Sequence, residues 1–187
     1  MQTLEAIALR RSIRRFKPDP VPRELIERVL LAGVQAPSGK NRQPWHFVVT
    51  QGAAKREAVD VMRAALLRRE EQGAELGTSK RTASHMEEAA AIVFIFWPGP
   101  EENTLGLPSE WWTIADVSSI GAAIENMLLA ALDLGLGTLW ICDVFYAYDP
   151  LRQWLGRQDQ MIAAIAIGYP DEAPDAGPRR GIEEMTT

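Results

Sequence analysis

The chain of 187 residues contains little cysteine and little histidine: one cysteine, Cys142, and two histidines, His46 and His85. A single cysteine excludes an internal disulfide, and these three residues are too few for a Cys/His zinc cluster. We therefore expect no metal site. For Cys142 we favour a small, buried, apolar side chain over a catalytic nucleophile, because the sequence identifies no base that would activate the thiol.

The sequence also lacks an excess of positive charge. Its 20 Lys and Arg residues are outnumbered by 25 Asp and Glu residues, which gives a formal net charge of −5. The basic residues are spread among acidic ones and form no stripe of the kind that nucleic-acid binding requires. Nucleic acid is therefore not an expected partner.

Long uninterrupted apolar runs are absent as well. The start, Met1 to Glu5, has no basic region followed by an apolar stretch, so we expect no signal peptide and a cytoplasmic protein. Acidic residues and glycines interrupt the apolar stretch 114–142, which predicts a buried helix followed by a strand and no membrane span. No linker divides the chain, so residues 1–187 are expected to form one domain.

Apolar periodicity predicts several helices. Residues Leu25, Ile26, Val29, Leu30 and Val34 share one helical face behind Pro22. The predicted helices run from Thr3 to about Arg11, from Pro22 to about Ala36, from Gly52 to about Glu75, from Ile114 to about Leu134, and around Pro150 to Leu155.

Four apolar runs of strand length are present, at 46–50, 90–97, 138–142 and 161–167. The run 90–97 is continuously apolar, which indicates a central strand rather than an edge strand. The segment 98–112 is predicted to be a loop that ends in Trp111-Trp112. These two tryptophans either pack against the neighbouring helix or form a rim over a binding site. The polar, proline-rich chain after Gly168 has the composition of a disordered tail.

Two segments carry the candidate chemistry. The first, Arg10-Arg11-Ser12-Ile13-Arg14, gathers three guanidinium groups and a hydroxyl, which suits a phosphate. Alternatively, Arg10 and Arg11 only complete the helix from Thr3, where cations favour the negative end of the helix dipole. The second, from Pro37 to Trp45, contains the small donors and turn residues that let a flat ring approach the backbone.

Together with Gly135-Leu136-Gly137-Thr138, these segments resemble the nitroreductase family of FMN-dependent oxidoreductases, from about Leu4 to Glu184. The resemblance implies an α+β fold in three layers (α/β/α), with a central mixed antiparallel sheet flanked by helices. It also implies an intertwined homodimer in which the C-terminal extension, residues 170–187, crosses to the partner subunit. The middle of the chain shows no match to the asparagine-and-lysine element that some nitroreductases place at the pyrimidine edge of the flavin.

The resemblance implies a flavin site built from two subunits. Arg10, Arg11, Ser12 and Arg14 would hold the phosphate and ribityl chain of FMN, and Arg179 or Arg180 would close the phosphate site. The strand end Trp140-Ile141-Cys142 would lie beside the ring. The other subunit would contribute Pro37, Ser38, Gly39 and Asn41.

The implied activity is hydride transfer from NADH or NADPH through flavin N5 to an electron-poor acceptor, a nitroaromatic or a quinone, by a ping-pong mechanism. FMN carries this chemistry, so no catalytic side chain is expected, and His46 is interpreted as structural. One alternative is another flavin reaction on the same fold, such as dehalogenation, dehydrogenation or flavin breakdown. The other is a flavin-binding sensor without catalysis.

Overall fold

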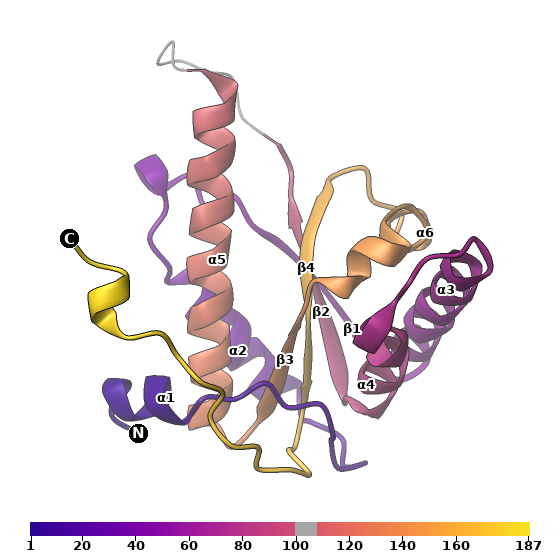
Figure 1. Cartoon of the computed structure of the whole chain (residues 1–187), viewed down its shortest axis with the longest axis horizontal. Coiled ribbons are helices and arrows are strands. Elements are labelled where there is room, and N and C mark those ends of the chain that lie inside the picture. The colour runs from indigo at the N-terminus through magenta and orange to yellow at the C-terminus, as the bar shows by residue number, and fades with distance from the viewer. Residues whose placement is uncertain (100–107) are drawn as a thin grey trace.

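A four-stranded sheet lies between two layers of helices in a computed structural model of the protein, which describes residues 1–99 and 108–187 (Figure 1). The strands follow the order β1 (His46–Gln51), β2 (Ala91–Trp97), β4 (Gln160–Gly168) and β3 (Gly137–Ile141), and each neighbouring pair is antiparallel. One isolated parallel bridge joins Ser12 to Thr138. The expected α+β fold with three layers is confirmed.

Each face of the sheet has its own group of helices (Figure 1). One face is covered by α2 (Arg23–Val34) and α5 (Ser109–Asp133), with α1 (Thr3–Leu9) beside α5. The other is covered by α3 (Gly52–Glu71), α4 (Thr82–Glu88) and α6 (Tyr148–Trp154).

Strand β2 is central, as its continuous apolar sequence predicts, and all seven of its residues are buried. Successive side chains of a strand point to opposite faces of the sheet. Accordingly, Phe94 and Phe96 pack with α3 and α4, whereas Val93 and Ile95 pack with α2 and α5. This strand therefore contributes to both apolar cores of the fold.

Helix α5 is long and apolar enough to cross a membrane by length and composition. Its inward face, which includes Ile120, Ile124 and Met127, is completely buried against α2 and the sheet. Helix α5 is therefore the core helix of this fold, as the interrupting polar residues predict.

Several boundaries differ from the sequence-based prediction. Helix α3 ends at Glu71, before Gly73, which has a φ of 85° that a helix cannot continue through. The sequence did not predict α4 or the 3₁₀ turn Gly77–Arg81 before it. Of the expected loop 98–112, residues 100–107 lie outside the described part of the chain.

The two tryptophans of that expected loop belong to the first turns of α5, which begins at Ser109 rather than near Ile114. Trp111 is 60% exposed, so within one chain the alternative that both tryptophans pack against the neighbouring helix does not hold for this residue. Trp112 is partly buried, and the guanidinium carbon of Arg42 lies 4.7 Å from its ring centroid.

The segment that follows α1 runs close against the edge of the sheet. The N–H of Ile13 donates to the carbonyl of Thr138 at 2.8 Å, and Phe16 forms an isolated bridge with Pro170. Two paired glycines of β3 and β4, Gly137 and Gly168, leave room for the side chains of Ile13 and Phe16. A Cβ atom on Gly137 would lie 2.9 Å from Cγ1 of Ile13 and 3.0 Å from two more of its atoms, so the side chain of Ile13 would have to move.

We expect Gly137→Ala to lower the free energy of unfolding by about 1–3 kcal/mol, because the added methyl group must displace the branched side chain of Ile13. Urea unfolding of the apoprotein measures this change. Gly177→Ala is the matched control, since its Cβ would meet only the tip of Arg179 at 3.6 Å. Equal stability of the two variants would contradict the close approach.

Candidate functional site

The arginine segment is fixed through its main chain, which leaves its side chains available. The carboxylate of Glu172 accepts the N–H groups of Arg14 at 2.5 Å and Arg15 at 3.2 Å. The carbonyl of Arg14 lies 3.1 Å from Nδ1 of His85. Together with the contact between Ile13 and Thr138, these bonds hold residues 12–16 in one conformation.

A cavity of about 300 Å³ lies beside this segment. Its lining residues are Arg10, Arg11, Ser12, Arg14, Pro174, Asp175, Gly177 and Arg179. The structure thus brings the four candidate phosphate ligands of the first segment together with Arg179 from the C-terminal extension. Arg180 does not line the cavity.

Two of these arginines already have protein partners. Arg11 donates to the carbonyls of Ala8 at 2.7 Å and Arg10 at 2.8 Å, so it caps the end of α1. Nε of Arg10 lies 3.5 Å from Glu125. A guanidinium group has five N–H donors. Both residues therefore retain donors for a ligand. Arg11 can complete α1 and still bind a phosphate.

A second cavity, of about 450 Å³, adjoins the first through Arg14, which lines both. Its other lining residues are Thr78, Arg81, Thr82, His85, Leu139, Trp140, Ile141, Cys142 and Asp143. The strand end Trp140-Ile141-Cys142 is therefore brought next to the arginine segment. The two cavities are therefore neighbours that share Arg14, one with a cationic lining and the other larger with a mixed lining.

The sequence analysis missed the residues of this site that precede and begin α4. Thr78, Arg81, Thr82 and His85 follow the spacing i, i+3, i+4, i+7, which places them on one helical face. Ala83 and Met86 are buried in the core. This polar face is the signal that could have identified the segment.

Contacts from two directions hold that segment in place. The hydroxyl of Thr82 donates to the Asp143 carboxylate at 2.5 Å. At the other end of α4, the ammonium of Lys55 donates to the carbonyls of Glu87 and Ala89, each at 2.5 Å. These contacts fix the position of His85 and Arg81 relative to β3.

Cys142 differs from the sequence-based expectation of a buried apolar side chain. It lies just beyond β3, is exposed, and lines the larger cavity. A strand that ends at the rim of a cavity exposes its next residue, which periodicity alone does not reveal. Partial burial and the carboxylate of Asp143 raise the pKa of the Cys142 thiol. Among the residues that the structure describes, no three His, Cys, Asp or Glu side chains form a metal-binding group.

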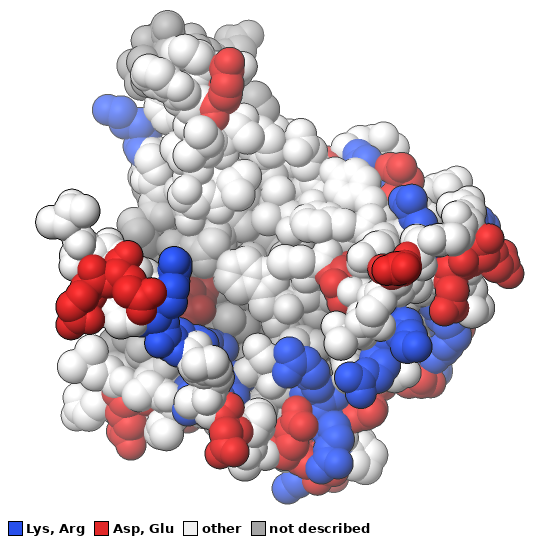
Figure 2. Space-filling view, viewed as in Figure 1, with Lys and Arg blue, Asp and Glu red and all other residues white. Residues whose placement is uncertain are grey.

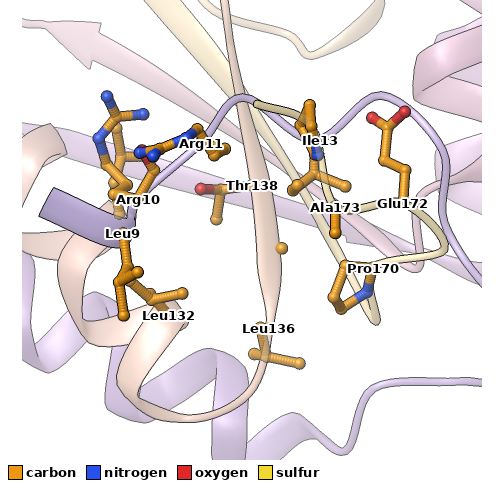
Figure 3. A pocket seen from close by; sticks show the side chains of 13 residues that line it. Leu9, Arg10, Arg11, Ile13, Leu132, Leu136, Thr138, Pro170, Glu172 and Ala173 are labelled. Carbon is orange, nitrogen blue, oxygen red and sulfur yellow. The ribbon is translucent and has the colours of Figure 1, made fainter. Parts of the chain in front are cut away.

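A third cavity, of about 300 Å³, lies between α1, the end of α5 and residues 170–174 (Figure 3). In Figure 3, Leu132 and Leu136 lie on one side of Thr138, and the guanidinium groups of Arg10 and Arg11 point away from them. This apolar space shares Arg10 and Arg11 with the cationic cavity. The two arginines therefore stand at the boundary between a polar and an apolar compartment.

The loop from Pro37 to Gln43 does not line these three cavities. It includes a short 3₁₀ turn, Gly39–Asn41, and packs against the first half of α5. A Cβ atom on Gly39 would lie 3.9 Å from the ring of Trp112. Pro37, Gly39 and Asn41 are exposed. Within one chain, the structure does not bring this loop together with the arginine segment. His46 begins β1, is exposed and lines none of the three cavities.

The fold is that of a known class of proteins. The model of the nitroreductase family matches residues 7–169. A relative from Archaeoglobus fulgidus, assigned by name as an NADH dehydrogenase or NAD(P)H nitroreductase, is 32% identical over 93% of this chain and 88% of its own length. The chain therefore belongs to the nitroreductase family, and the assignment based on its sequence motifs is confirmed.

Solved structures agree with this assignment. A crystal structure of an assigned nitroreductase from Desulfovibrio desulfuricans in complex with FMN is 30% identical, covers 98% of this chain and 94% of that chain, and has a TM-score of 0.76. A BluB-like flavoprotein from Clostridium difficile is 26% identical, covers 100% and 98% of the two chains, and has a TM-score of 0.80. The architecture is thus shared over essentially the full length.

We expect the Cys142 thiol to be accessible but slow to react at neutral pH. Its pKa is raised by partial burial and by Asp143, and the thiolate is the reactive form. The rate of alkylation by iodoacetamide can be measured by mass spectrometry between about pH 7 and pH 10. We expect this rate to keep rising at pH values above about 8.5, the ordinary pKa of a thiol. Asp143→Asn should react faster at neutral pH. An alkylation rate of Cys142 that stops rising near neutral pH would contradict the raised pKa of this thiol.

Proposed function

We propose that this protein is an FMN-dependent oxidoreductase that takes hydride from NADH or NADPH and passes it to an electron-poor acceptor of the nitroaromatic or quinone type. The observation that carries the proposal is the convergence of Arg10, Arg11, Ser12, Arg14 and Arg179 on one cavity, which shares Arg14 with a larger neighbouring cavity. This arrangement suits a ligand with a phosphate at one end and a flat polar ring at the other.

The cationic cavity fits the phosphate of FMN. A guanidinium group can donate two parallel hydrogen bonds to two oxygens of a phosphate, and the hydroxyl of Ser12 can donate one more. The segment that carries them is held by its main chain to Thr138 and Glu172, so little ordering is required when the ligand binds. Because Arg179 lines the cavity and Arg180 does not, we assign the closing arginine to Arg179.

The larger cavity fits the isoalloxazine ring. Trp140, Ile141 and Cys142 would lie along the ring, and Arg14 and Arg81 would place positive charge near it. FMN, when bound, supplies the redox chemistry by accepting and donating hydride at N5. The chain's task is to orient the ring and to stabilise negative charge on its reduced form. A single open face of the ring would serve the nicotinamide and then the acceptor, which is the basis of the proposed ping-pong order.

We further propose a homodimer with shared active sites. The loop residues Pro37, Ser38, Gly39 and Asn41 lie away from the arginine segment of their own chain, so they would complete the site of a second copy. Figure 2 shows a largely uncharged area over the upper part of α5 and the middle of the molecule, with charged side chains on both sides of this area and below it. Exposed apolar side chains of α5 include Trp111, Ile114 and Val117, which a partner subunit would cover.

The C-terminal extension, residues 170–187, fits the same arrangement. Its start is tied to its own subunit through Glu172, and it then continues as an extended segment with exposed residues to a short turn at Ile182–Glu184. The extension lines the cationic cavity of its own subunit as far as Arg179, and we propose that the part beyond Arg179 crosses to the partner subunit. A cytoplasmic location agrees with the proposed use of NADH or NADPH.

We expect Arg10→Ala combined with Arg14→Ala to give a folded apoprotein that has lost FMN affinity by about 100-fold or more, because two charged donors to the phosphate are removed. Fluorescence titration of the apoprotein with FMN measures the affinity. Arg23→Ala combined with Arg56→Ala is the matched control, since it removes the same charge from exposed helix positions. Unchanged FMN stoichiometry and affinity in the Arg10/Arg14 variant would contradict the site.

The activity is tested by anaerobic titration of the FMN-loaded protein. We expect NADH or NADPH to bleach the flavin absorption band, and a nitroarene or quinone to restore it after the nicotinamide product is removed. Flavin that stays oxidised with both nicotinamides would contradict the proposed donor and favour a flavin-binding sensor. Flavin that is reduced but not reoxidised by these acceptors would favour a different flavin reaction on this fold.

A further inference from the structure

The loop that we assign to the partner's flavin has an unfavourable backbone. Three of its residues adopt positive φ values without being glycine: Lys40 at 56°, Asn41 at 56° and Gln43 at 50°. Such conformations are uncommon and persist when surrounding contacts determine them. Within the loop, the N–H of Gln43 donates to the hydroxyl of Ser38 at 3.0 Å. This bond alone does not connect the loop to the core.

Arg42 makes that connection. It stands between the strained residues with an ordinary helical φ of −69°, and its side chain points into the protein with 11% exposed. Its Nη2 donates to Oδ2 of Asp116 on α5 at 3.0 Å. The guanidinium group also lies over the ring of Trp112, one turn earlier on the same helix, at 4.7 Å from the centroid. Arg42 is therefore held both by an ion pair and by stacking.

The anchor point itself is rigid. Asp116 is 1% exposed, and the indole N–H of Trp97, at the end of the central strand β2, donates to the same Oδ2 at 3.0 Å. In the described part of the chain, Oδ1 of Asp116 and Nε of Arg42 have no hydrogen-bond partner. Arg42 is thus the cation paired with this buried carboxylate, and the pair joins the loop to α5 and to the sheet.

We propose that the ion pair between Arg42 and Asp116 sets the conformation of the Pro37–Gln43 loop and thereby determines how tightly the partner subunit's flavin is held. Both are positioning residues, because neither lines the cavities assigned to FMN. The proposal rests on the proposed function for the identity of the ligand. What it adds is that the buried pair of Arg42 and Asp116, which lies away from the arginine segment of its own chain, controls FMN affinity through the backbone conformation of the Pro37–Gln43 loop.

A double-mutant cycle on FMN affinity tests the proposal. Arg42→Gln and Asp116→Asn remove the charges while retaining polar side chains of similar size. We expect each single variant to bind FMN about 10-fold more weakly, and the double variant also about 10-fold more weakly, since both changes break the same contact. If Arg42 and Asp116 acted independently, the double variant would instead bind FMN about 100-fold more weakly. Fluorescence titration of each apoprotein with FMN provides the dissociation constants.

Controls separate positioning from general destabilisation. Arg23→Gln and Glu27→Gln disrupt an exposed ion pair on α2 and should leave the FMN dissociation constant unchanged. Thermal unfolding without FMN and the mass from light scattering show whether each variant remains a folded assembly of the wild-type size. If Asp116→Asn does not fold, Arg42→Lys is compared with Arg42→Gln instead, because lysine keeps a positive charge beside Asp116 whereas glutamine removes it.

Folded variants that bind FMN as tightly as the wild type, or a double variant with additive losses, would overturn the proposal. Arg42→Lys, which can keep the one-point ion pair with Asp116, should bind FMN more tightly than Arg42→Gln, and equal losses of affinity in these two variants would also overturn the proposal. These results are distinct from failure of the proposed function, which would appear as absence of FMN binding by the wild-type protein itself.

Discussion

The attachment of residues 12–16 to the edge of the sheet is the contact on which the rest of the site depends. Ile13 donates to Thr138 of β3, and this close approach is possible because Gly137 and Gly168 have no side chains. Glu172 then fixes the same segment from the C-terminal side. Two regions far apart in sequence, the arginine segment and the C-terminal extension, thereby present arginine side chains to one cavity, which no single helix or strand could do.

The two layers of helices have different tasks around this contact. On one face, α4 and the turn before it place Arg81 and His85 beside β3 and so shape the larger cavity. On the other face, α5 supports the Pro37–Gln43 loop through the buried pair of Asp116 and Arg42. Since that loop lies away from the arginine segment of its own chain, we propose that the flavin contacts are divided between two copies of the chain.

Sequence patterns predicted the elements that have strong periodicity. The continuous apolar run 90–97 is the central strand, and the wide apolar face of α5 is its buried face. Sequence patterns gave the wrong result where the position of a residue depends on contacts with residues distant in the sequence. Cys142 was expected to be a buried part of the apolar run 138–142, because the sequence identifies no base that would activate it, yet β3 ends at Ile141 and Cys142 is exposed. The segment containing Thr78 and His85 was missed because its short helix depends on Lys55 and Asp143, which are distant in sequence.

The central claim is that FMN binds between the arginine segment of one chain and the loop of another. A crystal structure of the protein grown with FMN tests it most directly. The account predicts the phosphate among Arg10, Arg11, Ser12, Arg14 and Arg179, the ring along Trp140 to Cys142, and Pro37 to Asn41 of a second copy against the ring. An FMN phosphate bound elsewhere, or a ring enclosed by one chain alone, would contradict the account.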